Sequence, residues 1–268
     1  MTRRARVDAE LVRRGLARSR QQAAELISAG RVQIDGMPAA KPATTVSVDA
    51  KLTVAADERV WVSRGAHKLI GALDAFGVSV TGRRCLDAGA STGGFTEVLL
   101  DRGAAEVVAA DVGYGQLAWS LRSDDRVQVL ERTNVRSLTP DLIGGPVDLI
   151  VADLSFISLA TVLPALTACA SQQADIVPMV KPQFEVGKDR VGAGGVVSDP
   201  ALRAEAVLAV AQRAAQLHWH AVAVTASPLP GPSGNVEFFL RLRTGDDAAL
   251  TGADLERTIQ QAIDEGPQ

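Results

Sequence analysis

The fold follows from one stretch, Arg84-Cys85-Leu86-Asp87-Ala88-Gly89-Ala90-Ser91-Thr92-Gly93-Gly94-Phe95, in which an apolar strand runs into a glycine-rich turn. The residues after it, through Leu100 to Gly103, predict a helix. Glycines let a backbone approach a ligand closely, and the start of a helix offers unpaired N–H groups. The spacing G-x-x-x-G-G differs from the dinucleotide pattern G-x-G-x-x-G, and no Gly-Lys-Ser/Thr of a phosphate-binding loop follows. We therefore predict a ligand-binding turn of another kind, with a purely structural turn as the alternative.

The residues on the C-terminal side of this turn predict alternating strands and helices. Strands are expected at 107–112, 127–130, 147–152, 176–180, 221–225 and 236–242, and a long helix at 201–217. Continuous apolar strands separated by helices indicate a parallel sheet covered on both faces, an α/β fold. Polar side chains fall at the strand ends, where such sheets bind ligands: Asp87, Asp111, Asp153 and Lys181.

Asp111 lies 22 residues after Gly89, at the end of the second strand. A carboxylate at that place can accept hydrogen bonds from ribose hydroxyls. Together with a loop that lacks pyrophosphate spacing, it favours a nucleoside-type cofactor such as S-adenosylmethionine.

The first 50 residues predict a separate small α+β unit. A helix should span Val7 to Val12 and end near Gly15, and Ser19 should cap a second helix that ends at Gly30. An alternating strand over 31–34 then runs into an Asp35-Gly36 turn. We place this unit at 1–56, a linker at 57–63 and the larger domain at 64–268. Trp61 in the linker is expected to pack between the two.

The net charge of −3 is divided unevenly along the chain. Residues 1–42 hold nine basic and four acidic side chains, net +5, whereas the remainder holds 19 basic and 27 acidic, net −8. Seven of these basic residues are arginines within the first 20 positions, and arginine suits phosphate because its planar fork can make two contacts. A basic unit that meets a nucleic acid is therefore predicted, the alternative being a solvated charged face.

Composition excludes several other classes of protein. There is no apolar run of the length that a membrane helix needs and no apolar segment after the N-terminal charges, so neither a membrane span nor a secretory signal is expected. The two cysteines, Cys85 and Cys169, lie in apolar segments typical of buried thiols, and three histidines without C-x-x-C argue against a metal site. We expect a reduced, cytoplasmic, metal-free protein.

Five motifs together carry a family resemblance. They are Ser63-Arg64-Gly65-Ala66-His67-Lys68-Leu69, the turn Asp87 to Phe95, Asp153-Leu154-Ser155-Phe156, Val180-Lys181-Pro182-Gln183-Phe184-Glu185, and Pro232-Ser233-Gly234-Asn235-Val236-Glu237. In this order they resemble FtsJ-like ribose 2′-O-methyltransferases. Behind a basic unit whose segment 30–36 is similar to an RNA-binding motif of a ribosomal protein and of pseudouridine synthases, they resemble the TlyA subgroup, whose members are labelled haemolysin or ribosomal RNA methyltransferase.

The resemblance implies a Rossmann-like class I methyltransferase domain with a seven-stranded, mostly parallel sheet. It implies the catalytic tetrad Lys68, Asp153, Lys181 and Glu237. A ribose hydroxyl is a poor nucleophile until its proton is removed, and a lysine that is clustered with another cation and partly desolvated can act as the base. We assign that role to Lys181, held by Asp153, while Lys68 steers the oxygen and Glu237 hydrogen-bonds the lysines or the ribose.

Two sets of binding residues complete the prediction. The S-adenosylmethionine site should comprise Asp87, Gly89, Ser91, Thr92, Gly93, Gly94, Phe95, Asp111, Val112, Asn134 and Asp153. The RNA-binding residues should be Arg3, Arg4, Arg6, Arg14, Arg18, Arg20, Lys41, Arg64 and Lys188. The subgroup implies cytidine 2′-O-methylation of ribosomal RNA in the 30S and 50S subunits, and hence sensitivity to tuberactinomycin-type antibiotics.

Some positions depart from the family pattern or stay ambiguous. Asn134 stands where related enzymes often have Asp, and Phe95 replaces a Trp that packs against the cofactor. The glycine-rich loop 186–195 is either a mobile lid near the RNA or a disordered connector. A membrane-active haemolysin, a non-catalytic RNA-binding protein and a base methyltransferase are the competing functions. The last would need an Asn/Asp-Pro-Pro-aromatic motif where Asp153-Leu154-Ser155-Phe156 stands.

Overall fold

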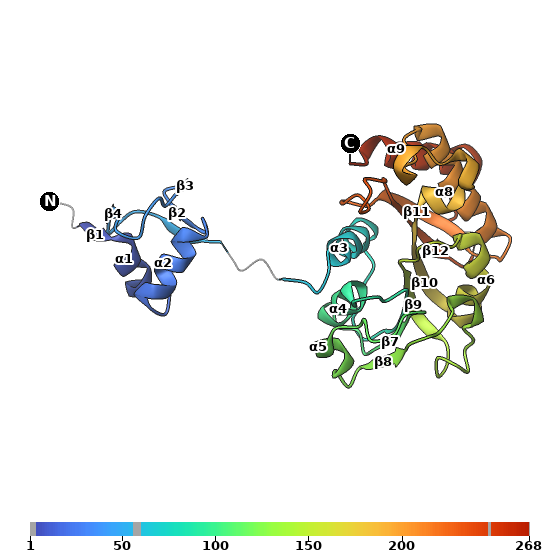
Figure 1. Ribbon diagram of the computed structural model, residues 1–268, viewed down its shortest axis with the longest axis horizontal. Helices are drawn as coiled ribbons and strands as arrows, with labels where there is room; N and C mark the ends of the chain where they lie inside the picture. The colour runs from blue at the N-terminus through green and yellow to red at the C-terminus, as the bar shows by residue number, and fades with distance from the viewer. Residues whose placement is uncertain (1–3, 56–59, 246–247, 268) are drawn as a thin grey trace. The chain divides into compact units, whose positions relative to one another are not determined.

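The computed structural model describes residues 4–55, 60–245 and 248–267, and its chain divides into two units, 1–60 and 61–268 (Figure 1). This division falls inside the segment that we predicted as a linker. Trp61 belongs to the second unit, where its partly buried ring packs against the core.

In residues 4–55 the first unit forms two helices and five short strands. They are β1 (Arg4–Arg6), α1 (Val7–Arg13), α2 (Arg20–Ser28), β2 (Val32–Ile34), β3 (Met37–Pro38), β4 (Thr45–Ser47) and β5 (Leu52–Val54). Strands β3, β2 and β5 form one antiparallel sheet, and β1 pairs with β4. The predicted cap is confirmed, since Ser19 Oγ accepts a hydrogen bond from Gln22 N at 3.1 Å. The Asp35-Gly36 turn is also confirmed: both residues have positive φ, 51° and 86°, as a tight hairpin turn requires.

The second unit is built on a seven-stranded sheet of order β11-β12-β10-β9-β6-β7-β8. Its strands are β6 (Arg84–Ala88), β7 (Glu106–Ala110), β8 (Val127–Leu130), β9 (Val147–Ala152), β10 (Ala170–Val180), β11 (His220–Ala226) and β12 (Phe238–Arg243). The pairs from β10 through β9, β6 and β7 to β8 are parallel, and β12 pairs antiparallel with both of its neighbours, β10 and β11. The predicted mostly parallel sheet is therefore confirmed.

Helices cover both faces of this sheet (Figure 1). The helices are α3 (Gly65–Phe76), α4 (Gly94–Asp101), α5 (Trp119–Arg122), α6 (Leu159–Cys169), α7 (Pro182–Glu185), α8 (Pro200–Ala215) and α9 (Gly252–Glu265). One core cluster joins α3, α4 and α5 to the sheet, and a second joins α6, α8 and α9 to the opposite face. Of these helices we predicted α4 and α8 from the sequence but not α3, α5, α6, α7 or α9, although α3 carries Lys68. No helix among the described residues is both long and apolar enough to span a membrane.

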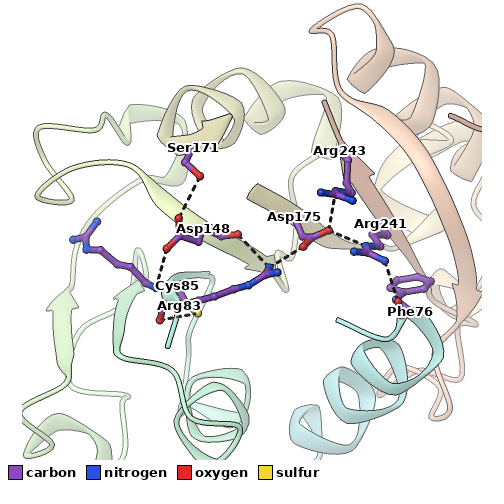
Figure 2. Close-up of polar contacts among 9 residues, drawn as sticks. Phe76, Arg83, Cys85, Asp148, Ser171, Asp175, Arg241 and Arg243 are labelled. Atoms are coloured by element: carbon purple, nitrogen blue, oxygen red, sulfur yellow. Dashed lines mark hydrogen bonds and ion pairs between the residues drawn. The ribbon is translucent and has the colours of Figure 1, made fainter. Parts of the chain in front are cut away.

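Ion pairs tie the strands together at the end of the sheet where β6 begins (Figure 2). Asp175 on β10 is buried and contacts three guanidinium groups: Arg83 at 2.7 Å, Arg241 at 2.8 Å and Arg243 at 3.5 Å. Arg241 also donates to the carbonyl oxygen of Phe76 at the end of α3. Burial alone would raise the pKa of Asp175, but hydrogen bonds from Arg241 and Arg83 hold it below its usual value.

Replacing Asp175 should destabilise the second unit strongly, because three arginines would lose their buried counter-charge. We expect Asp175→Ala to lower the free energy of unfolding by about 3 kcal/mol. Denaturant titration followed by tryptophan fluorescence measures this, since all three tryptophans lie between residues 61 and 219. The control is Glu106→Ala. Glu106 pairs with Arg84 but its side chain is 40% exposed, so its loss should cost less than about 1 kcal/mol. Equal losses in both variants would contradict the assigned role of Asp175.

Candidate active site

The four residues predicted as a catalytic tetrad line a single cavity of about 340 Å³. Lys68 comes from the first turns of α3, Asp153 follows β9, Lys181 follows β10, and Glu237 immediately precedes β12. Residues far apart in the sequence meet here because β9, β10 and β12 are neighbours in the sheet.

Lys68 and Glu237 form a buried ion pair. Their Nζ and Oε2 atoms are 2.6 Å apart, and the residues are 7% and 1% exposed. Gly231 lies against the other carboxylate oxygen, where a Cβ would come within 2.7 Å of Oε1. Glu237 is thereby confined, and it fixes the ammonium group of Lys68 at the cavity wall.

Lys181 has two partners on the loop that follows β9. Its Nζ lies 2.6 Å from Asp153 Oδ1 and 3.0 Å from Ser155 Oγ. Asp153 is itself anchored, since its backbone N–H donates to Ala88 at the end of β6. Ser155 belongs to the motif Asp153-Leu154-Ser155-Phe156 but was not among the predicted site residues.

The glycine-rich turn forms the adjoining wall of the cavity. Ser91 N donates to Asp111 Oδ2 at 2.8 Å, and Gly113 N donates to Asp111 Oδ1 at 2.7 Å, so this carboxylate holds two loops together. A Cβ at Gly89 would overlap the carbonyl oxygen of Asp153, which explains the glycine. Ser91 lines both this cavity and a small crevice beside Asp111.

The crevice is bounded by residues at the ends of β7 and β8. It is lined by Ala90, Ser91, Ala109, Asp111, Gly113, Gln116, Leu117, Val129 and Glu131. Gln116 and Glu131 are not among the predicted site residues. Glu131 directly follows β8, so it could have been found in the same way as Asp111, which directly follows β7.

Asp87 fits a positively charged cofactor beneath the turn. It is fully buried, its Oδ2 accepts a hydrogen bond from Thr96 Oγ1 at 2.7 Å, and its Oδ1 has no hydrogen-bond partner among the described residues. Burial raises the pKa of Asp87 to about 7. S-adenosylmethionine carries an ammonium and a sulfonium group, and a cation nearby would supply the missing positive charge.

Six predicted cofactor residues line neither the cavity nor the crevice: Asp87, Gly93, Gly94, Phe95, Val112 and Asn134. Phe95 is 3% exposed and packs on Phe239 with ring centroids 6.2 Å apart, so it belongs to the core and not to a cofactor wall. Gly94 allows close packing against Ser63. Asn134 caps the turn η1 (Val135–Ser137) through its side-chain oxygen, and Val112 is exposed. Gly93 caps α4 with a φ of 101°. Among the others, Gly89, Ser91, Thr92 and Asp153 line the cavity, and Ser91 and Asp111 line the crevice.

The predicted RNA-binding cations of the first unit differ in how they are held. Arg6 and Arg20 both pair with buried Asp8, at 2.8 and 3.0 Å, yet stay 50% and 59% exposed. Arg4, Arg18 and Lys41 are exposed, and Arg3 lies outside the described residues.

Arg14 is held by contacts within the first unit. Its guanidinium bonds Glu10 and the carbonyl oxygens of Val48 and Ala50, so it braces α1 against the turn between β4 and β5. Nε and both terminal nitrogens of the guanidinium group therefore donate hydrogen bonds within the first unit.

Two predicted cations of the second unit lie beside cavities. Arg64 is exposed and lines the tetrad cavity. Lys188 lines a neighbouring cavity of about 590 Å³ together with Phe156, Ile157 and Phe184.

The glycine-rich loop forms two short 3-10 turns, η2 (Lys188–Arg190) and η3 (Ala193–Gly195). It is tied down by an Arg190–Glu205 ion pair and by a hydrogen bond from buried Asn235 to the Gly195 carbonyl. This is more order than a disordered connector would have. No cluster of metal-ligating side chains occurs in the part of the chain that the structure describes.

Comparison with known proteins agrees with this architecture. Residues 61–244 match the FtsJ-like methyltransferase family, and residues 5–52 match the S4 domain. The 16S/23S rRNA (cytidine-2′-O)-methyltransferase TlyA of Mycobacterium tuberculosis is 76% identical over 268 residues, all of both chains. Hemolysin A of Brachyspira hyodysenteriae is 34% identical over 87% of this chain and 97% of its own. A solved protein of Streptococcus thermophilus with a provisional hemolysin name is 35% identical, covers 99% of this chain and 98% of its own, and gives a TM-score of 0.72.

Removing the buried charge of Asp87 should stabilise the ligand-free protein at high pH. The carboxyl has a pKa of about 7 when folded and about 4 when unfolded, so the folded state gives up stability as the pH rises between those values. We expect the melting temperature of Asp87→Asn, relative to the native chain, to increase from pH 5 to pH 8. Thermal unfolding followed by tryptophan fluorescence measures the difference.

The same substitution should weaken S-adenosylmethionine binding at pH 8, as measured by calorimetry, because it removes a negative charge beneath the glycine-rich turn, where we expect the cofactor's cations to bind. Thr96→Val serves as a matched control for loss of the hydrogen bond to Asp87. A pH-independent difference in melting temperature would contradict the assigned titration of Asp87.

Proposed function

Because this chain belongs to the TlyA group of FtsJ-like methyltransferases, we propose that it transfers a methyl group from S-adenosylmethionine to the 2′-hydroxyl of cytidine in the RNA of both ribosomal subunits. The observation that carries this proposal is the cavity in which two lysine–carboxylate pairs adjoin the glycine-rich turn. A methyl acceptor and a methyl donor could meet there.

Lys181 is the general base in this proposal. As a neutral amine it would accept the proton of the ribose hydroxyl, and the ammonium so formed would lie 2.6 Å from the Asp153 carboxylate. Opposite charges this close and 10% and 26% exposed attract strongly, because little water screens them. Asp153 thus stabilises the product of the proton transfer and holds the amine in place before it.

Lys68 positions the ribose oxygen. Its ammonium is fixed by Glu237, yet it lines the cavity and can donate a hydrogen bond to an oxygen that gains negative charge. When bound, S-adenosylmethionine would supply a methyl carbon attached to a cationic sulfur. The ribose oxygen would bond to this carbon as the carbon–sulfur bond breaks, and the electron pair of the broken bond would stay on sulfur. Asp111, Ser91 and Gly89 would hold the cofactor so that the two reactants meet in line.

The first unit would bind the RNA through its phosphates. This unit matches the S4 domain, and the family resemblance implies that it binds RNA. Its exposed cations include Arg4, Arg6, Arg18, Arg20 and Lys41. Phosphate contacts position a protein on RNA without reading its sequence. Selection of cytidine must then come from the cavity side, with the target nucleotide turned out of its stack.

Loss of the base should abolish methyl transfer without loss of binding. We expect Lys181→Ala to lose at least about 100-fold in the rate of label transfer from S-adenosylmethionine to ribosomal subunits, within the range for removal of a general base. The affinities for cofactor and subunits should stay within about threefold. Filter-retained label measures the first, and calorimetry and subunit pelleting measure the others.

Lys181→Arg separates the base role from simple charge, since a guanidinium keeps the positive charge but is never deprotonated in a protein. It should be as inactive as Lys181→Ala. Activity close to that of the native chain in either variant would rule out Lys181 as the base.

Charge reversal on the first unit should weaken subunit binding. We expect Arg18→Glu combined with Arg20→Glu to lower the affinity for subunits at least tenfold at low salt and to flatten its salt dependence, because fewer counterions are released. Cofactor affinity should not change. Binding measured across a salt series provides both quantities.

The matched control reverses two exposed, ion-paired arginines of the second unit, Arg126→Glu and Arg257→Glu. It changes the net charge by the same amount and should have a much smaller effect. Equal effects of the two double variants would mean that overall charge, and not the first unit, governs RNA binding.

A further inference from the structure

The loop after β9 places a second side chain on the amine of Lys181. Ser155 Oγ lies 3.0 Å from Nζ, in addition to the 2.6 Å contact with Asp153 Oδ1. The Lys181 side chain is 10% exposed, whereas Ser155 is exposed and lines the tetrad cavity. The two partners reach the amine from two positions on one loop.

We propose that Ser155 is a positioning residue that, together with Asp153, aims the lone pair of Lys181 into the cavity. The proposal rests on the function above, in which Lys181 takes the proton of the ribose hydroxyl. A neutral amine nitrogen is tetrahedral and carries two N–H bonds and one lone pair besides its bond to Cε. In the structure Nζ donates a hydrogen bond to Ser155 Oγ and forms an ion pair with Asp153 Oδ1. In the neutral amine, one N–H kept on Ser155 and the other drawn toward the Asp153 carboxylate would leave the remaining direction to the lone pair.

Asp153 alone would not define that direction. With a single partner, the lone pair and the second N–H can exchange between the two tetrahedral directions that remain. A second acceptor removes this freedom. When the proton arrives it becomes the third N–H, and neither existing contact has to break.

The loop that carries Ser155 is braced against the segment that carries Lys181. The Glu185 carboxylate accepts hydrogen bonds from Ser158 Oγ at 2.6 Å and from Leu159 N at 2.8 Å. The rings of Phe156 and Phe184 lie 5.2 Å apart across the same gap. These contacts join the two segments beyond their strands, so the distance from Ser155 to Lys181 is fixed by the fold.

The backbone beside Ser155 supports the same placement. Phe156 has a φ of 64°, a left-handed conformation that costs a bulky residue energy. The chain turns sharply there, directly after the hydroxyl that contacts Lys181. The sharp turn and the brace together leave Ser155 facing the cavity beside Asp153.

Steady-state kinetics of Ser155→Ala and Ser155→Thr in the full-length protein test the proposal. We expect Ser155→Ala to lower kcat about tenfold to a hundredfold, the size of effect that misplacement of a reacting group produces. KM for ribosomal subunits and Kd for S-adenosylmethionine should stay within about threefold of the native values. Ser155→Thr keeps a hydroxyl at the same atom and should recover most of kcat.

Ser198→Ala is the matched control, because Ser198 is exposed and does not line the tetrad cavity. It should have native kinetics, and all three variants should melt within about 2 °C of the native chain. An unchanged kcat in Ser155→Ala, or an equal loss in the Ala and Thr variants, would overturn the positioning role. Lys181→Ala shows which proposal has failed. If Lys181→Ala is active, the proposed base is wrong. If Lys181→Ala is inactive but Ser155→Ala has the native kcat, only the role of Ser155 is wrong.

Discussion

Parallel pairing of β7, β6, β9 and β10 is the constraint on which the rest of the structure depends. Parallel strands end at the same edge, so the polar residue at each end must lie near the others: Asp111, Asp87, Asp153 and Lys181. The register sets the spacing, and the hydrogen bond from Asp153 N to Ala88 O extends it one residue beyond the strands. The positions of the glycine-rich turn, the crevice and the tetrad cavity are consequences of one sheet edge.

Charge is buried at both ends of this sheet, with opposite results. At one end Asp175 is matched by three arginines and ties β10 to neighbouring segments. At the other end Asp87 keeps one oxygen without a partner among the described residues, and its pKa is raised to about 7. The buried carboxylate of Asp175 stabilises the fold, whereas that of Asp87 lowers stability at neutral pH, a cost that is common at functional sites.

Much of this could be predicted from the sequence, for reasons that particular residues make clear. Apolar strands that end in Asp or Lys predicted the sheet and the polar residues at its edge. The five motifs predicted the tetrad through the family resemblance. Three-dimensional packing decided the remainder: Phe95 turned inward to Phe239, Asn134 became a cap, and Arg14 was committed to Glu10 and two carbonyl groups. The contact between Ser155 and Lys181 depends on a turn at Phe156 that no spacing rule encodes.

The most direct test of the central claim is nucleoside analysis of ribosomal RNA. Unmodified 30S and 50S subunits are incubated with the full-length protein and S-adenosylmethionine carrying a deuterated methyl group, and the RNA is digested and analysed by mass spectrometry. The account predicts deuterated 2′-O-methylcytidine from both subunits with the native chain and none with Lys181→Ala. Label on a base, or no label in RNA from either subunit, would contradict it.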